Sequence, residues 1–321
     1  MRLLVRSALY IVLCALPAAA QTGGPQVNRD PQKVRFITED IDNFWRAYDL
    51  AGKESDRAKR ISIYQTEYLD KGSAGLADFV RLRIKSAKDL VAAIETQPKY
   101  YASIRPSTLR VREMEKGMRK SFRNFKKLYA DAVFPDVYFV IGVSNTGGTT
   151  SKNGLLIGAE MYGLTPRTPR EELADWMKAV LKPVEKLPAI VAHELIHFNQ
   201  HYPEPKTLLG KSIQEGSADF IGELISDDTI NPDQKSYGDR HEAELWREFQ
   251  KEMNGASVAN WMYNGLSAKD RPTDLGYYMG YKICRSYYKN ARDKRQAIRD
   301  ILEIKDFPAF LAASRYGVSQ D

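Results

Sequence analysis

Residues 187–199 read LPAIVAHELIHFN, and the interpretation of the whole chain depends on this stretch. Its apolar residues recur at helical spacing, Pro188 suits the first turn of a helix, and Pro203 would end it. His193 and His197 stand four residues apart in it. Four residues advance a helix by about 400°, so both imidazoles project from nearly the same side and can reach one metal ion.

Glu194 follows the first histidine and completes an HExxH pattern. Its side chain points about 100° away from the histidines, so it can address a water molecule on the ion rather than the ion itself. The pattern therefore predicts a metal centre with a base beside it. The alternative is a buried helix with two hydrogen-bonded histidines and no metal.

A second helix, predicted over residues 208–225, supplies a third ligand. Glu215 lies eighteen residues after His197, and a short loop between the helices favours antiparallel packing. We expect Gly216 and Ala218 to let these two helices approach closely. Asp219, one turn after Glu215, can accept the second ring N–H of a ligand histidine. For both acids the alternative is an ordinary surface charge.

His201 is not expected to join these ligands. It lies one further turn along and is rotated by about another 40°, so a helix cannot easily bring three imidazoles to one ion. Gln200 and Pro203 stand where the metzincin pattern requires glycine and histidine, which excludes that pattern.

These residues resemble the gluzincins, metallopeptidases with HExxH on one helix and a glutamate ligand on the next. More narrowly, the chain resembles a family of predicted zinc-dependent proteases among bacterial exported proteins. The specific features are HELIH and EGSAD at 215–219, and the looser ones are Phe44-Trp45 and residues 145–149, 154–158 and 276–281. The resemblance implies a zincin-like core in which residues 154–160 form the edge strand above the metal, with Gly147 and Gly148 giving backbone freedom in a turn near the substrate.

The resulting hypothesis is a zinc peptidase. His193, His197 and Glu215 would hold Zn²⁺, and Glu194 would act as general base on the metal-bound water. Tyr278 and Tyr281 are the preferred donors to the oxyanion, with His241 and Tyr277 as alternatives, although core packing explains each of these residues equally well.

Two other hypotheses remain open. One is an exported binding or envelope-assembly protein with a structural or vestigial zinc site, against which the intact Glu194 counts because a structural ion needs no base. The other is a zinc hydrolase of non-peptide amides or esters. The expected partner is a peptide or protein substrate, and the oligomeric state stays open.

Residues 1–20 have the features of an export signal. Two arginines precede an apolar run, and cleavage is expected after Ala20. The run is about half the length needed to span a bilayer, so no transmembrane anchor is expected after cleavage. The residues before Cys14 make a poor lipoprotein signal. We therefore predict a periplasmic or secreted protein whose only mature cysteine, Cys284, cannot form an internal disulfide.

Composition fits a globular chain of this size. Its 321 residues are 43% apolar and 28% charged, with a formal net charge of +7. The basic run Lys116–Lys127 carries a buried apolar stripe, and together with export this argues against nucleic acid. After a linker at 21–33, we predict a helical part at 34–133, with helices near 38–50, 56–69, 74–96 and 107–130, and a metallopeptidase core at 134–321 with paired strands near 137–141 and 155–159. The predicted fold class is α+β, predominantly α.

Overall fold

The computed structural model describes residues 27–265 and 270–317. The helices of its N-terminal half are α1 (Glu39–Ala51), α2 (Arg57–Tyr64), α3 (Ala74–Phe79), α4 (Ala87–Thr96), α5 (Pro98–Leu109) and α6 (Glu115–Leu128). Those of its C-terminal half are α7 (Asp175–Val180), α8 (Leu187–Asn199), α9 (Leu208–Ser226), α10 (Pro232–Glu252), α11 (Leu275–Asn290), α12 (Lys294–Leu302) and α13 (Phe307–Ser314). The predicted signal peptide lies outside the described residues.

A four-stranded mixed sheet lies between the two sets of helices. Its strands are β1 (Phe36–Ile37), β2 (Asp136–Val140), β3 (Gly148–Ser151) and β4 (Gly154–Gly158), in the order β1-β2-β4-β3. β2 is parallel to β1 and β4, whereas β3 is antiparallel to β4. Gly154 connects β3 to β4 with a φ of +148°, and a Cβ there would lie 2.2 Å from the Asp136 carbonyl oxygen, so only glycine fits.

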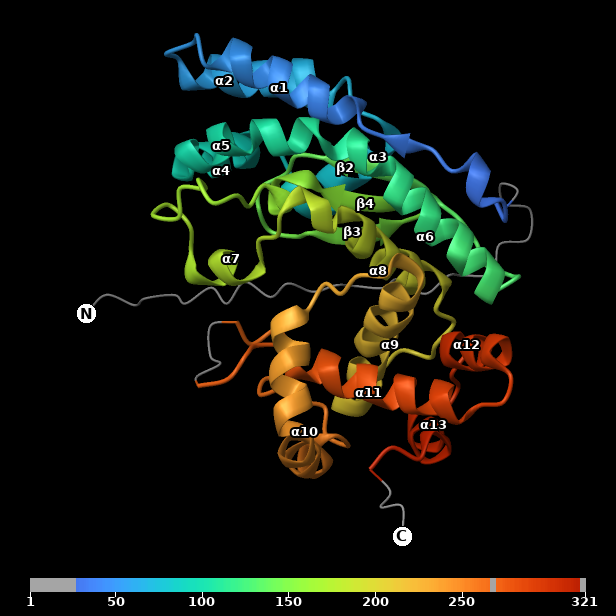
Figure 1. Cartoon of the computed structure of the whole chain (residues 1–321). Helices are drawn as coiled ribbons and strands as arrows, with labels where there is room; N and C mark the ends of the chain where they lie inside the picture. The colour runs from blue at the N-terminus through green and yellow to red at the C-terminus, as the bar shows by residue number, and fades with distance from the viewer. Residues whose placement is uncertain (1–26, 266–269, 318–321) are drawn as a thin grey trace.

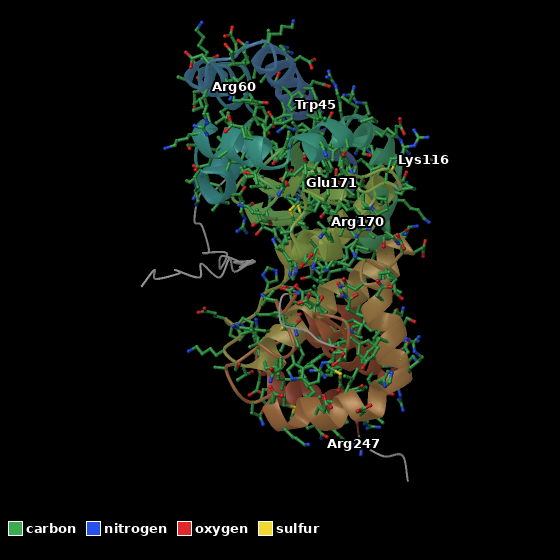
Figure 2. All side chains as sticks on the ribbon, turned by 90° about the vertical axis from the view of Figure 1, so that its left-hand side faces the viewer. Trp45, Arg60, Lys116, Arg170, Glu171 and Arg247 are labelled. Atoms are coloured by element: carbon green, nitrogen blue, oxygen red, sulfur yellow. The ribbon has the colours of Figure 1, made fainter. Side chains whose placement is uncertain are left out.

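The molecule is layered around this sheet (Figure 1). α1 contacts β2, and α3 contacts β2 and β4, with α2, α4 and α5 in the same N-terminal helical part. α8 contacts β3 and β4, and α9 to α13 form a helical body beyond α8. Trp45 connects α1 to α5, because its indole N–H donates to Thr108 Oγ1 on α5 at 2.9 Å. Figure 2 shows Trp45 in the N-terminal helices and Arg247 at the opposite end of the molecule.

The prediction of a predominantly helical α+β protein is confirmed. The strands predicted near 137–141 and 155–159 are β2 and β4, and they pair. The helix predicted over 74–96 is interrupted, because Lys85 adopts a φ of 75° and Ser86 then caps α4 through the Asp89 N–H. We did not predict α5 separately; it begins at Pro98 and includes a second proline, Pro106.

One expectation about the sheet is wrong. The edge strand is β3, which forms from a stretch we expected to be turns, and β4 lies inside the sheet. The residues predicted as a linker also include an ordered part, since the backbone N–H of Phe134 donates to the Asn28 carbonyl oxygen at 2.8 Å. In the part of the chain that is described, no helix combines the length and apolar character needed to cross a membrane.

The close contacts of α9 also differ from expectation. Gly216 faces α11 rather than α8, since a Cβ there would lie 2.1 Å from the backbone nitrogen of Tyr281. A Cβ at Gly280 of α11 would lie even closer to α9, 1.7 Å from the carbonyl oxygen of Ser212. On the α8 side, Gly222 approaches the backbone of His193. α9 is therefore held between α8 and α11, which fixes the direction of its ligand-bearing face.

Candidate metal centre

The predicted ligands come together at the contact between α8 and α9. His193 and His197 lie on α8 with their rings edge to face and 4.6 Å between centroids. The two Nε2 atoms are 3.0 Å apart. Oε2 of Glu215, on α9, lies 3.2 Å from Nε2 of His197 and 3.6 Å from Nε2 of His193. All three residues are at least nine-tenths buried.

These spacings fit a tetrahedral metal ion. Ligand bonds of about 2.0 to 2.1 Å place neighbouring ligand atoms about 3.3 Å apart. The three observed separations, 3.0, 3.2 and 3.6 Å, lie around that value. The described residues therefore contain a buried group of two imidazoles and a carboxylate that could hold a metal ion.

Each histidine is oriented through its second ring nitrogen. Nδ1 of His193 lies 2.8 Å from Oδ1 of Asp219, and Nδ1 of His197 lies 2.9 Å from Oε1 of Gln200. These contacts favour the tautomer that carries its proton on Nδ1, which leaves the Nε2 lone pair for a metal. Asp219 is held in turn by Asn231, whose amide donates to Oδ2 at 2.7 Å.

Gln200 is a ligand-orienting residue that we did not predict. It follows the last residue of α8, and its amide donates to the Gln214 carbonyl oxygen and to Ser217 Oγ on α9. Tyr263 is the other, and its hydroxyl donates to Oε1 of Glu215 at 3.4 Å. Gln200 lies three residues after His197, and this spacing is only a weak sequence signal for its role. No spacing points to Tyr263, 48 residues after Glu215.

Burial and neighbouring charges shift the pKa values of these residues in opposite directions. Burial alone would raise the pKa of Glu215, but the two imidazoles lower it below its ordinary range. Burial alone would lower the pKa of His193, yet its contacts with Asp219 and Glu215 raise it to about 10. The site therefore strongly favours positive charge beside its carboxylates, and a divalent cation would supply that charge.

Glu194 points from α8 toward β3. A Cβ at Gly148 would lie 2.4 Å from its Oε1, so this glycine provides space rather than the backbone freedom we expected. Oε2 of Glu194 is buried and has no hydrogen-bond partner among the described residues. Burial raises the pKa of Glu194 above its ordinary value. A buried, unpartnered carboxylate oxygen next to the ligands is further evidence that this cavity suits a cation.

The aromatic residues proposed as oxyanion donors have their polar atoms bonded elsewhere. The Tyr278 hydroxyl donates to Asp239 on α10, and the Tyr281 hydroxyl donates to Glu223. His241 lies in α10 and stacks on Tyr237. His201, which we excluded, is exposed beyond the end of α8.

Comparison with known families decides how the centre is interpreted. The family model described as gliding motility protein GldB matches residues 59–318. The chain belongs to the GldB family. Comparison with the curated proteins and with the solved structures finds no match.

This membership corrects the functional prediction. The resemblance to gluzincins and to exported zinc-dependent proteases is overturned, and with it the assignments as a peptidase, protease, metalloprotease or zinc hydrolase. The part of the chain that the structure describes likewise shows no zincin core, only the small mixed sheet among helices. The error has a physical reason: HExxH followed by a glutamate specifies how three ligands converge, and the convergence of ligands does not by itself determine what a protein does.

The short label of the matched family, GldB_lipo, describes lipoproteins. The expectation of an exported protein agrees with this label. Location in the periplasm or outside the cell, and the absence of nucleic-acid partners, stay predictions.

Proposed function

We propose that this chain is an exported component of gliding motility machinery whose Zn²⁺ site is structural. The observation that carries the proposal is the convergence of His193, His197 and Glu215 at the buried contact between α8 and α9. In this role the ion joins two helices from neighbouring layers of the molecule.

Burial supports a structural role for the ion. Exposure of the three ligand residues ranges from 2% to 8%, and Glu194 is equally covered at 5%. Zn²⁺, when bound, would offset the negative charges of Glu194, Glu215 and Asp219, which otherwise depend on protonated histidines for compensation. Loss of the ion would therefore weaken the packing of α8 against α9, and α9 in turn packs against α11.

Glu194 provides the sharpest test. A structural ion does not need a proton-transfer group, so Glu194→Gln should retain zinc, thermal stability and function. His197→Ala should lose all three. The readouts are zinc content by mass spectrometry, the midpoint of thermal unfolding, and colony spreading of the source bacterium when its own gene carries each substitution.

Two outcomes would overturn the structural assignment. One is a Glu194→Gln protein that binds zinc and folds normally but no longer supports spreading. The other is a purified wild-type protein that contains no zinc and does not acquire any. A digest of a broad peptide library should show no cleavage by either protein.

The family label also bears on membrane attachment. It supports a lipid on Cys14, which the preceding residues led us to disfavour; this part of the chain lies outside the described residues. A lipid anchor would hold the protein on a membrane surface without a spanning helix. Mass spectrometry of the N-terminal peptide from native membranes, compared with Cys14→Ser, tests this point.

A further inference from the structure

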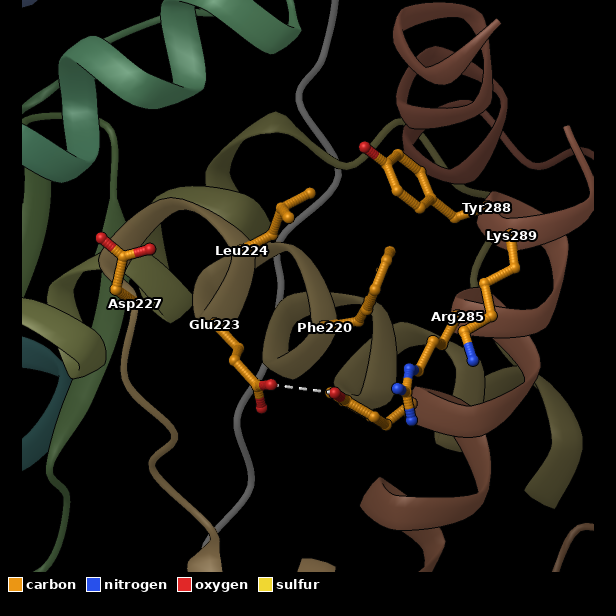
Figure 3. Close-up of a pocket in the computed structure, with 8 residues that line it drawn as sticks. Phe220, Glu223, Leu224, Asp227, Arg285, Tyr288 and Lys289 are labelled. Carbon is orange, nitrogen blue, oxygen red and sulfur yellow. Dashed lines mark hydrogen bonds between the residues drawn. The ribbon is translucent and has the colours of Figure 1, made fainter. Parts of the chain in front are cut away.

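A surface pocket of about 470 Å³ lies between α9 and α11, on a different face of α9 from the metal ligands (Figure 3). Three of its residues come from α9, one directly follows that helix, and four come from α11: Phe220, Glu223 and Leu224, then Asp227, then Tyr281, Arg285, Tyr288 and Lys289. Its size suits one or two side chains of a bound peptide.

Part of the pocket is apolar. The rings of Phe220 and Tyr288 meet edge to face with centroids 5.4 Å apart. Leu224, beside them, is 36% exposed and is one of the few large apolar side chains at the surface of the described residues. An exposed leucine next to two aromatic rings offers contact area to a second apolar group.

The acids of the pocket already have partners. Glu223 accepts from the Lys235 ammonium at 2.6 Å and from the Tyr281 hydroxyl at 3.0 Å, the contact drawn in Figure 3. Asp227 is paired with Lys120 of α6 at 2.7 Å. Neither carboxylate is therefore free to neutralise a cation across the pocket.

The cations of the pocket are different. Across residues 27–265 and 270–317, neither Arg285 nor Lys289 has a hydrogen-bond acceptor or an acidic partner, and Arg285 is partly buried. Figure 3 shows both side chains extending from α11 along the side of the pocket that faces Phe220. A partly buried guanidinium carries five N–H donors in a planar fork that matches a carboxylate.

We propose that this pocket binds a protein segment in which a carboxylate, from a side chain or a chain end, stands next to an aromatic or branched apolar side chain. The carboxylate would pair with Arg285 and Lys289, and the apolar group would pack on Phe220, Leu224 and Tyr288. The inference deepens the proposed function, because it gives the exported protein a recognition site for a partner.

The charge pattern favours a peptide over a membrane surface. Asp227 has 67% of its side chain exposed at the rim, so a uniformly anionic layer of headgroups would meet a like charge there. A peptide can place one carboxylate beside the two cations and keep neutral or basic groups near Asp227.

The experiment uses a fluorescein-labelled octapeptide with a central glutamate-phenylalanine pair flanked by glycine and serine. The matched probe has glutamine in place of glutamate, and vesicles containing phosphatidylglycerol form the third probe. Fluorescence anisotropy and vesicle sedimentation are measured with the wild-type protein, with Arg285→Gln/Lys289→Gln, and with Arg247→Gln. Arg247 is an exposed cation on α10 whose guanidinium donates to the Ala243 carbonyl oxygen of the same helix, which makes it the control.

The wild-type protein should bind the glutamate peptide about tenfold more tightly than the glutamine peptide, since two partly exposed ion pairs each contribute up to about fivefold. The double variant should lose that preference, and Arg247→Gln should keep it. Lys289→Glu, at an exposed position, provides a second variant and should weaken binding further. Equal binding of both peptides, no binding of either, or vesicle binding without peptide binding would each overturn the proposal.

Zinc content and thermal unfolding are measured on the same samples. Because Arg285 and Lys289 lie on α11, whereas the metal ligands lie on α8 and α9, the double variant should keep the zinc and the unfolding midpoint of the wild type. If the double variant loses peptide binding but keeps its zinc, the result concerns the pocket and not the proposed metal site. Absence of zinc from every sample bears on the proposed metal site alone.

Discussion

Glu215 and Glu160 are both buried carboxylates, yet their surroundings shift their pKa values in opposite directions. Glu215 faces two imidazoles, and its pKa falls below the ordinary range. Glu160 lies beneath the loop after β2, where it accepts the backbone N–H of Ser144 at 3.1 Å, and burial raises its pKa to about 7. One Glu160 carboxylate oxygen has no partner among the described residues.

The difference shows which of the two buried carboxylates needs a cation to compensate its charge. A carboxylate that receives only backbone N–H groups can reduce its cost of burial by taking up a proton. A carboxylate held as an anion between two imidazoles, with further acids nearby, needs positive charge instead. Among residues 27–265 and 270–317, only the group around Glu215 has three ligand atoms close enough together to share one ion.

The largest predicted effect comes from removing a ligand. His197→Ala should abolish stoichiometric zinc binding and leave the Glu215 carboxylate without its nearest partner. Loss of one member of a buried charged group costs about 3 to 5 kcal/mol, which for a chain of this length lowers the unfolding midpoint by about 10 °C. Differential scanning calorimetry and zinc analysis measure both changes.

His201→Ala is the matched control for that experiment, because this histidine is exposed just beyond the same helix. It should change neither zinc content nor the unfolding midpoint. If His197→Ala behaves like His201→Ala, Glu215 does not depend on a cation, and the contrast with Glu160 disappears.

The second prediction concerns pH and Glu160. Because its folded pKa of about 7 lies above the ordinary value of 4.5, the folded state holds this proton more tightly than the unfolded state. Stability from this group is complete below pH 4.5 and declines as the pH rises to 7, by about 3 kcal/mol at most. Glu160→Gln should remove this decline, which urea unfolding at several pH values can measure.

That test uses the difference between wild type and variant at each pH, so contributions from other groups cancel. A difference that stays constant from pH 4.5 to pH 7 would show that Glu160 does not titrate in this range. In that case Glu160 would resemble Glu215 in remaining ionised when buried.

Much of the metal centre could be predicted from sequence because its information is local. His193 and His197 share one helix face, and Glu215 and Asp219 share another, so helical periodicity alone places them in pairs. Their meeting required only that two successive helices pack together.

The other features of the site and the sheet depend on tertiary contacts, which produce no regular spacing of residues in the sequence. Tyr263 reaches Glu215 from an irregular segment, and β3 forms from a glycine-rich stretch only because β4 offers it an edge. Gly216 was assigned to the wrong neighbour because sequence shows that a close contact is possible without showing which helix makes it. The peptidase prediction was wrong because the geometry of potential ligands does not determine what a protein does.

The third prediction tests the orientation of His193. Asp219→Asn keeps the shape of the side chain but removes the negative charge that lies 2.8 Å from Nδ1 of His193. Outer partners of this kind contribute about 10- to 100-fold to metal affinity, so zinc should transfer to a competing chelator at correspondingly lower chelator concentration. Asp239→Asn, which alters a carboxylate bonded to Tyr278, should leave the titration unchanged. An unchanged titration for Asp219→Asn would mean that α8 packing alone orients the imidazole.

The smallest predicted effect comes from Tyr263→Phe. The hydroxyl lies 3.4 Å from Oε1 of Glu215, a long hydrogen bond, and the residue is 38% exposed, so water can take its place. Zinc affinity should fall by no more than about threefold in the same chelator titration, with Tyr278→Phe, whose hydroxyl donates to Asp239 on α10, as the control for loss of a hydroxyl. A loss as large as that of Asp219→Asn would show that Tyr263 moves closer when the ion binds. Glu215 would then be fixed from both carboxylate oxygens, whereas Glu160 has a partner on only one, and the contrast between the two acids would extend from charge to geometry.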